Sequence, residues 1–334
     1  MFPYNLEMAA SNTWLITGGA GYIGSHIADE FLTSGKDVIL FDSLHNGLLS
    51  RVEYLCQKHN KEITLVISDL RDELSLNQVF TTHNPIGIVH AAALKSVAES
   101  MQHPEEYMKV NCEFTEQLLR IAAKHRVREF IFASTAAIYG SPKNSVPIRE
   151  DDLKKPVSPY GVSKLLAEKE IDKYFKNFTF NGTSLRFFNV VGAASPELMD
   201  NSVENLVPIV MNALKTKQNP IIYGTDYETP DGTCIRDYVD VRDIARASLY
   251  VADYPGPLPF ALNVGTGKGV SVREVIELVA KNAGQNNLVT IEADRRAGDP
   301  ETLFADISLI EATLGFKAKF SLEEGIQSLY PESK

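Results

Sequence analysis

Three side chains that could move a proton lie in two short segments near the middle of the chain. Tyr160 and Lys164 directly follow Pro159 and are four residues apart, a spacing that puts both on one face of a helix. An ammonium group near a phenol favours the phenolate and lowers its pKa, so Tyr160 is predicted to act as a general base near neutral pH. Thr135 follows an apolar run and offers a hydroxyl to a substrate oxygen. The ordinary alternatives are a solvated helix surface and a turn-capping threonine.

A glycine-rich segment near the N-terminus predicts a dinucleotide site. It reads Thr17-Gly-Gly-Ala-Gly-Tyr-Ile-Gly24, between an apolar run and a helical pattern. Glycines at this spacing tighten the turn and let the backbone approach a pyrophosphate, which the N–H groups of the following helix meet. Asp42 ends the next apolar run. Its carboxylate can accept from ribose hydroxyls and would repel a 2′-phosphate, so NAD is favoured over NADP. The alternative is a tight turn and a strand-end aspartate without a ligand.

The elements that position these groups alternate between strands and helices over the first half of the chain. Such alternation predicts crossover connections and a parallel sheet, and uninterrupted apolar strands predict burial on both faces. We therefore expect an α/β fold with a Rossmann-like, doubly wound parallel sheet and a smaller C-terminal α/β substrate lobe. The expected strands are 14–17, 38–41, 63–67, 86–90, 130–133 and 183–188, and the expected helices are 22–34, 48–58, 104–125 and 160–177.

The regular alternation of strands and helices ends after about residue 190. We expect a helix over 205–215, a strand over 221–223, a loop over 224–233, and short strands with a helix over 288–314. A capping box, Ser271-Val-Arg-Glu274, marks a helix start. Residues 238–250 and 260–264 are expected to return to the first sheet. The predicted division is an NAD-binding domain over 1–190, to which 235–265 return, and a nucleotide-sugar lobe over 191–234 and 266–334.

The composition narrows the class of protein further. The 334 residues carry 33 Lys and Arg against 43 Asp and Glu, a formal net charge of −10, which argues against a general nucleic-acid binder. Three widely spaced cysteines, Cys56, Cys112 and Cys234, indicate reduced thiols and no metal site. The first residues lack the pattern of a secretory signal, and no apolar run is long enough to span a membrane. A cytoplasmic protein without membrane contact is therefore expected.

Taken together, these motifs resemble the extended short-chain dehydrogenase/reductase family. The match rests on the glycine-rich turn, the segment Ala133-Ser-Thr-Ala-Ala-Ile-Tyr-Gly140, and Ser158-Pro-Tyr-Gly-Val-Ser-Lys164. Four later segments are similar to the UDP-glucose 4-epimerases of that family: 184–193, 223–238, 263–267 and 295–299. The resemblance covers nearly the whole chain, and the segment 224–238 is its most specific part because it belongs to the substrate side.

The resemblance implies an NAD-dependent isomerase that interconverts UDP-glucose and UDP-galactose. The sugar would be oxidised at C4, the 4-keto sugar would rotate, and hydride would return to its other face. Tyr160 would act as the base, Thr135 would hydrogen-bond the 4-oxygen, and Lys164 would bind the nicotinamide ribose. A homodimer is implied, through helices near 104–125 and 160–177.

The same resemblance implies two sets of binding residues. The cofactor positions are Gly18, Gly21, Tyr22, Ile23, Gly24, Asp42, Ser43, Asn46, Asp69, Leu70, Ala91, Ala92, Ala93, Lys95, Asn111, Tyr160 and Lys164. The substrate positions are Lys95, Thr135, Tyr160, Asn189, Asn205, Leu206, Tyr223, Arg236, Arg296, Asp299 and Leu303. Independently of the resemblance, the guanidinium forks of the two arginines suit phosphate oxygens.

Several of these positions have competing interpretations. Asp69 could instead cap a helix, the alanines 91–93 could be strand-end packing, and Arg236 and Arg296 could form ion pairs with Asp237 and Asp299. Asn189 is followed by Val190 where the family usually has proline. Leu303 stands where a bulky aromatic residue would exclude a 2-acetamido group, so a UDP-N-acetylhexosamine remains an alternative substrate.

Other functions on the same scaffold are also open. A UDP-glucuronate epimerase would need only an added group for the carboxylate. A nucleotide-sugar 4,6-dehydratase would carry an acidic pair directly after Thr135, where this chain has Ala136 and Ala137, and methyl groups cannot protonate a leaving hydroxyl. A non-catalytic dinucleotide sensor would not need Tyr160, Lys164 and Thr135 together.

Overall fold

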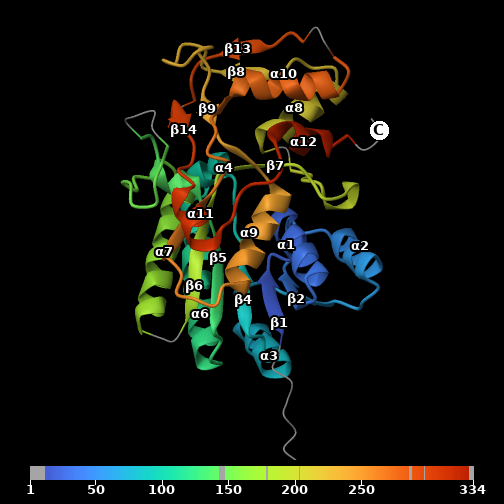
Figure 1. The fold of residues 1–334 in the computed structure, drawn as a ribbon, viewed down its shortest axis with the longest axis vertical. Helices are drawn as coiled ribbons and strands as arrows, with labels where there is room; N and C mark the ends of the chain where they lie inside the picture. Colours follow the sequence, from blue (N-terminus) through green and yellow to red (C-terminus); the bar gives the residue numbers. More distant parts are fainter. Residues whose placement is uncertain are drawn as a thin grey trace, which may run out of the picture.

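A sheet of seven parallel strands forms the centre of the computed structural model, which describes residues 12–142, 147–177, 180–202, 204–285, 288–296 and 298–330. Its order is β11-β6-β5-β4-β1-β2-β3 (Figure 1). The strands are β1 (Thr13–Thr17), β2 (Asp37–Asp42), β3 (Thr64–Ile67), β4 (Gly87–His90), β5 (Glu129–Thr135), β6 (Asn181–Phe187) and β11 (Ala261–Val264). The predicted Rossmann-like, doubly wound sheet is confirmed, and all six predicted strands are present.

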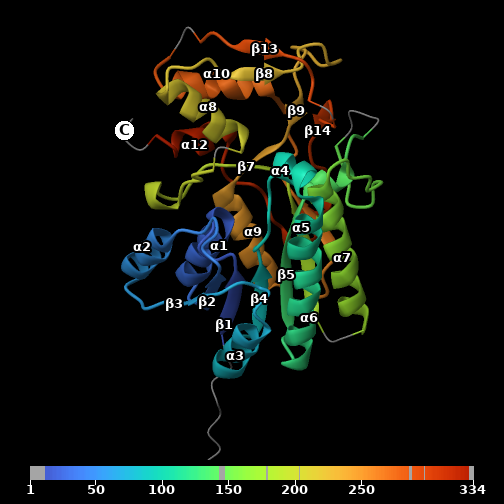
Figure 2. The ribbon, with the colours of Figure 1, turned by 180° about the vertical axis from the view of Figure 1, so that it is seen from behind.

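Helices cover both faces of this sheet, because side chains alternate between faces along each strand. Trp14 and Ile16 point into one apolar layer, and Leu15 points into the other. The first layer holds α1 (Tyr22–Thr33), α2 (Leu49–His59), α9 (Val241–Asp253) and α11 (Ser308–Leu314). The second holds α3 (Glu73–His83), α6 (Phe114–Lys124) and α7 (Pro159–Asn177). Figure 2 shows α6 and α7 side by side on the outer face, and their residues are in contact.

A second group of elements sits above the carboxyl ends of the strands (Figure 1). It has its own apolar core, with Val207, Ile222, Ile276 and Ile326 at its centre. Its helices are α8 (Leu206–Lys215), α10 (Val272–Asn282) and α12 (Leu322–Gln327), and a 3-10 turn, η3 (Pro196–Leu198), precedes them. Its strands pair in three small sheets, β10 (Tyr238–Asp240) with β7 (Asn189–Val191), β13 (Ile291–Ala293) with β8 (Ile221–Tyr223), and β12 (Val270–Ser271) and β14 (Thr302–Leu303) with β9 (Ile235–Arg236).

Two expectations about the fold gain detail. The predicted helix over 104–125 is present as one continuous run, α5 (Pro104–Met108), a π-helical turn η1 (Lys109–Glu113) and α6, and a short helix, α4 (Val97–Gln102), precedes it. Residues 260–264 do join the sheet, through β11. Residues 241–250 also return to the sheet, as helix α9 that packs on its face beside α1, whereas β10 pairs with β7 and does not join the sheet. The capping box at Ser271 is confirmed.

Three further findings concern membrane helices, cysteines and metal sites. Within the described ranges, no helix is long and apolar enough to cross a membrane. Cys56, Cys112 and Cys234 are all free thiols. Within those same ranges no cluster of His, Cys, Asp or Glu could hold a metal ion.

Candidate active site

The three proposed catalytic side chains meet where β5 ends and α7 begins. Thr135 is the last residue of β5 and precedes the 3-10 turn η2 (Ala136–Tyr139), whose Ala137 N–H donates to its Oγ1 over 3.1 Å. Its hydroxyl lies near that of Tyr160 and acts to lower the Tyr160 pKa. Lys164 lies one turn further along α7, with its Nζ 4.0 Å from the centre of the Phe132 ring. The structure therefore brings Thr135, Tyr160 and Lys164 to one edge of the sheet.

The start of α7 fits closely against the segment after Thr135. A Cβ on Gly161 would lie 2.8 Å from the Ala137 carbonyl oxygen, closer than real Cβ contacts come. The Ser158 hydroxyl accepts from Gly161 N–H over 3.1 Å and so caps the helix start. The glycine between Tyr160 and Val162 thus allows α7 to approach η2, which fixes Tyr160 beside Thr135.

The protonation of this pair differs from the sequence prediction. Burial raises the pKa of the Tyr160 hydroxyl, and the Thr135 hydroxyl only partly offsets that effect. Burial also lowers the pKa of Lys164 to about 7, against a raising effect of Glu168. The predicted lowering of the Tyr160 pKa by Lys164 is therefore wrong for the protein alone. The spacing gave the shared face of the helix, but it carried no information about desolvation.

The glycine-rich turn has the shape and the free N–H groups that a dinucleotide needs. Gly18 has φ +69°, and a Cβ there would lie 2.7 Å from Ala92 N, while one on Gly24 would lie 2.1 Å from the Gly18 oxygen. Only glycine fits at these two positions. Among the described residues, no side chain caps the N-terminus of α1, and its first turn holds no acidic residue. The first-turn N–H groups of Tyr22, Ile23 and Gly24 therefore suit a phosphate.

Asp42 joins this turn to the loop that follows β2. Its two carboxylate oxygens accept from Ala20 N over 2.9 Å and Leu44 N over 2.8 Å. A carboxylate has about four acceptor sites, so both oxygens can still bind ribose hydroxyls. Ser43 and Asn46 lie exposed on the same loop.

Asp69 and Leu70 lie where β3 ends, next to this loop in the sheet order. Asp69 accepts from Arg71 N and pairs with the Arg71 guanidinium, while Asp72 caps α3. The helix-cap interpretation of Asp69 is therefore wrong. Leu70 is buried in the second apolar layer.

The segment after β4 completes the cofactor side. Ala91, Ala92 and Ala93 are half-buried, and Ala92 lies under Gly18. Asn111, from η1, is fully used inside the protein. Its Oδ1 accepts from Leu94 N over 2.9 Å, and its Nδ2 donates to Leu94 O and to the Ser163 hydroxyl. Asn111 therefore ties this segment to α7 between Tyr160 and Lys164.

On the proposed substrate side, the structure brings together five of the predicted residues. The Arg296 guanidinium lies 3.8 Å over the centre of the Tyr223 ring, and Arg236 pairs with Leu303 in the register of β9 and β14. Arg236 approaches Asp299 at 3.9 Å. Asp237 turns the other way and accepts from backbone N–H groups of Thr266, Gly267 and Ala305. The predicted alternative of an Arg236–Asp237 ion pair is therefore wrong, and the Asp299 pair is long.

The remaining substrate candidates lie further along the same side. Asn189 is exposed at the start of β7, and its N–H donates to Asp237 O. Leu206 opens α8, and Asn205 stands just before it and donates to Asp200 over 2.8 Å. Lys95 donates to the Ser202 hydroxyl and lies 3.6 Å from Asp200. Asp200 thus joins a cofactor candidate, Lys95, to a substrate candidate, Asn205.

Sequence reasoning missed Asp200, because the segment after β7 has no periodic pattern. It also missed Glu168, for which a signal existed, since it follows Lys164 by the same four-residue step that separates Lys164 from Tyr160.

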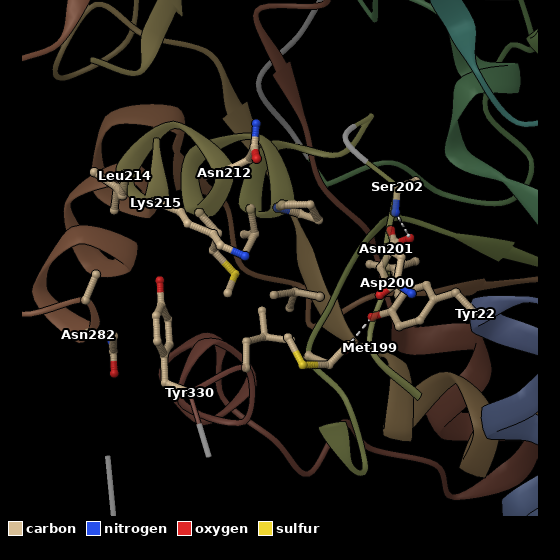
Figure 3. A pocket seen from close by; sticks show the side chains of 18 of the residues that line it. Tyr22, Met199, Asp200, Asn201, Ser202, Asn212, Leu214, Lys215, Asn282 and Tyr330 are labelled. Atoms are coloured by element: carbon tan, nitrogen blue, oxygen red, sulfur yellow. Dashed lines mark hydrogen bonds between the residues drawn. The ribbon is translucent and has the colours of Figure 1, made fainter. Parts of the chain in front are cut away.

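A cavity of about 780 Å³ borders Asp200, but Thr135, Tyr160 and Lys164 are not among its lining residues. Figure 3 shows Tyr22 and Asp200 at one end of this cavity and Tyr330 at the other; the Tyr22 hydroxyl donates to Gly192 O over 2.5 Å.

The fold and this site define a class of protein, and comparison with known families agrees. Residues 15–329 match the sequence model of the family described as GDP-mannose 4,6 dehydratase. That match covers most of the chain. The chain, with its parallel sheet and the helix that carries Tyr160 and Lys164, therefore belongs to the extended short-chain dehydrogenases/reductases.

Individual relatives narrow the class further. The UDP-glucose 4-epimerase of Halalkalibacterium halodurans is 38% identical over 94% of this chain and 93% of its own length. The structure is similar to that of the UDP-glucose 4-epimerase from Bifidobacterium longum in complex with NAD+ and UDP, with a TM-score of 0.88 and 37% identity over 95% of this chain and 96% of that one. The chain therefore belongs to the UDP-glucose 4-epimerase family.

A further solved structure bears on the sugar. The UDP-Glc/GlcNAc 4-epimerase from Campylobacter jejuni has a TM-score of 0.84 and 36% identity, covering 95% of this chain and 98% of that one.

Proposed function

We propose that this chain is an NAD-dependent enzyme that interconverts UDP-glucose and UDP-galactose. The observation that carries the proposal is the meeting of two sides at one sheet edge. Leu303, which pairs with Arg236, packs in one apolar cluster with Ala136, the residue after Thr135. A sugar near Thr135 and Tyr160 would thus have its diphosphate near the guanidinium groups of Arg236 and Arg296.

Each proposed catalytic residue has one task. Bound NAD supplies the acceptor and donor of hydride at the sugar C4. Tyr160 takes the proton of the 4-hydroxyl and later returns it, and Thr135 hydrogen-bonds the same oxygen. Lys164 binds the nicotinamide ribose and holds a positive charge near Tyr160. Its pKa of about 7 leaves it partly charged at neutral pH.

The remaining candidates divide between the two ligands. The cofactor would be held by the glycine-rich turn, Asp42, the exposed groups that follow β2, and the ends of β3 and β4. The nucleotide sugar would be held by Asn189, Asn205, Leu206, Tyr223 and the two arginines. This assigns the first lobe, with β11, to NAD and the second to the UDP-sugar.

The test is turnover without added cofactor. Purified protein is incubated with UDP-galactose, and UDP-glucose formation is followed. We expect conversion, and release of NAD when the protein is denatured. No conversion of UDP-galactose, combined with conversion of UDP-glucuronate, would overturn the substrate.

A wider sugar range is a second candidate, supported by Leu303. It is buried and aliphatic, and the Campylobacter jejuni enzyme named above acts on both UDP-Glc and GlcNAc. A single extra or missing methylene in a pocket discriminates by about 1–3 kcal/mol, and a tyrosine ring adds more bulk than that. We therefore expect turnover of UDP-N-acetylglucosamine by the natural chain and its selective loss in Leu303→Tyr.

The assembly and location follow the family. We propose a cytoplasmic homodimer that pairs through the outer faces of the helices α5, α6 and α7. Light scattering in solution checks the mass, and charged substitutions at the exposed Val162 of α7 should weaken the dimer.

A further inference from the structure

A buried ion pair lies beneath the end of β5. Glu168, on α7, and Arg186, on β6, have side chains only 2% and 3% exposed. Arg186 Nη2 donates to Glu168 Oε2 over 2.7 Å, and its Nε donates to Oε1 over 3.0 Å. This two-pronged geometry is the strong form of an arginine–carboxylate pair. Fully buried pairs of this kind are weak contributors to stability compared with apolar packing, so their presence calls for another reason.

The pair reaches the catalytic hydroxyl through one residue. Ser134 Oγ donates to Glu168 Oε1 over 2.6 Å, and Ser134 is buried. Ser134 directly precedes Thr135, and side chains alternate between faces along a strand. The bond therefore fixes the end of β5 from the face opposite Thr135. In this way it sets the direction in which the Thr135 hydroxyl points.

The pair also reaches the proposed ribose-binding lysine. Glu168 and Lys164 are four residues apart on α7, so they share a face of the helix with Tyr160. The Glu168 charge raises the pKa of Lys164, against the burial that lowers it. The neighbouring Phe132 ring adds a second, weaker attraction for the ammonium group.

Other polar groups close the network around the pair. Arg186 Nη1 donates to the Tyr139 hydroxyl and to Glu150 O, and Tyr139 donates to Asn263 Oδ1 on β11. The charged or titratable groups that face Glu168, Arg186 or Lys164 from the surrounding elements are Tyr139, Glu150, Lys154 and His90, and Asp306 faces Glu150 in turn. His90 is buried and its pKa falls to about 3, so it is neutral at working pH.

We infer that Glu168 is a positioning residue for the reaction, with Arg186 as its counter-ion. It orients Thr135 through Ser134 and supplies a buried negative charge to Lys164 and Tyr160. This inference rests on the proposed roles of Tyr160, Lys164 and Thr135. It extends the active site by one layer, from the groups that touch the sugar to the ion pair beneath them.

The first test is the acidic limb of the pH profile of kcat/KM. Glu168→Gln removes a negative charge, so the Tyr160–Lys164 pair should lose its proton more easily. The apparent pKa that defines the acidic limb should therefore fall by about one pH unit. Arg186→Met breaks the same ion pair but leaves Glu168, so its limb should stay or move up. A merely structural role predicts the same change in both variants.

A direct titration of Tyr160 gives a readout that does not need turnover. The tyrosinate absorbance of each protein is measured against its own Tyr160→Phe derivative. We expect the Tyr160 titration to lie lower in Glu168→Gln than in the natural chain. Equal midpoints, or a downward shift in Arg186→Met as large as in Glu168→Gln, would overturn the inference.

Ser134→Ala tests the second contact and removes only one hydroxyl. Glu168 keeps both bonds from Arg186, so this variant should fold even if Glu168→Gln does not. We expect kcat to fall about tenfold with KM nearly unchanged, because the direction of Thr135 matters in the transition state. A kcat within twofold of the natural chain would contradict the inference.

Asp243→Asn is the matched control. Asp243 is a fully buried carboxylate on α9, in the opposite apolar layer, where it pairs with Arg246 and accepts from Lys319 N and Phe320 N. It should lose stability as Glu168→Gln does, with no movement of the pH limb. If the natural chain turned over no UDP-sugar, the proposed function would fail, while the Tyr160 titrations would still decide this inference.

Discussion

The proposed cofactor side and the proposed sugar side of the active site are built in different ways. On the cofactor side, Asp42, Asn111 and Lys164 are buried, and the first two hold several hydrogen bonds inside the protein. On the sugar side, Arg296, Asp299 and Asn189 are exposed, and the Arg236–Asp299 contact is long. The cofactor side is thus preorganised by the chain itself, while the charges of the sugar side remain available to a ligand. The proposed catalytic residues belong to the preorganised side.

The largest effect is expected where the preorganised side does chemistry. Tyr160→Phe removes the proposed base but keeps the ring that packs edge-on against Tyr107. General acid–base groups contribute about 10²–10⁴-fold, so kcat should fall about a thousandfold. NAD released on denaturation should stay at the natural level. Retained turnover would break the assignment of the base.

The preorganised side should also be the acid-sensitive one. His26 Nε2 accepts from Ala194 N over 3.0 Å, and its Nδ1 lies 2.8 Å from Tyr22 O, so the bonded ring is neutral. Burial lowers its pKa to about 4, and that of His90 to about 3. As the pH is lowered below about 6.5, the histidines of the unfolded chain therefore take up protons before those of the folded chain do. The free energy of unfolding decreases as the pH decreases.

The expected loss is about 2 kcal/mol per histidine between pH 6.5 and 5. Urea unfolding at pH 7 and pH 5 measures it. His26→Gln should be less stable at pH 7 yet show a flatter dependence, and the difference between the two slopes isolates His26. Parallel slopes would show that His26 is already charged when folded.

The sugar side should respond through binding. Arg236 is buried. Arg236→Ala is expected to raise the KM for UDP-galactose about thirtyfold, since truncating one partner of a buried charged pair, here the proposed pair with the diphosphate, costs about 2 kcal/mol or more. Arg296→Ala, at an exposed site, should raise KM less. The kcat should change little in either variant. A fall in kcat with unchanged KM would move Arg236 into the catalytic side of the comparison.

The smallest effect is expected at the edge of the cofactor side. Asp69 and Arg71 form an exposed ion pair, and such pairs contribute about 0–1 kcal/mol. Arg71→Ala should therefore leave thermal unfolding nearly unchanged. Asp69→Ala should change stability as little but weaken NAD retention slightly. Equal NAD retention in the two variants would remove Asp69 from the cofactor site.

The sheet could be predicted from the sequence because each of its strands is marked by a short, continuous run of apolar residues. Runs such as Val38–Phe41 are apolar throughout, and the glycine-rich turn carries its conformation in its residue types. The π-helical turn η1 had no such signal, because Lys109 to Glu113 fit a regular helical pattern equally well. How residues 238–250 return to the sheet was not predictable either, since a helix that covers a sheet and a strand that joins it share apolar residues.

The site was predictable where the chemistry lay within one helix or turn. Tyr160, Lys164 and the three glycines needed only their spacing. The pKa of Tyr160 was not predictable, because burial depends on Tyr107, α5 and η2 together. Asp200 could not be found either, since its partners Lys95 and Asn205 are brought to it only by the folded chain.

The number of residues in the π-helical turn η1 determines where Asn111 lies relative to the proposed active site. A π-helical turn holds one residue more than the α-helix around it and often occurs at functional sites. Each residue of an α-helix advances by about 100°, so deleting one residue from 109–113 would let the helix close regularly and turn α5 against α6 by that angle. Asn111 would then leave Leu94 and Ser163. A gap of a single residue here would remove a support of the catalytic helix without changing any catalytic side chain.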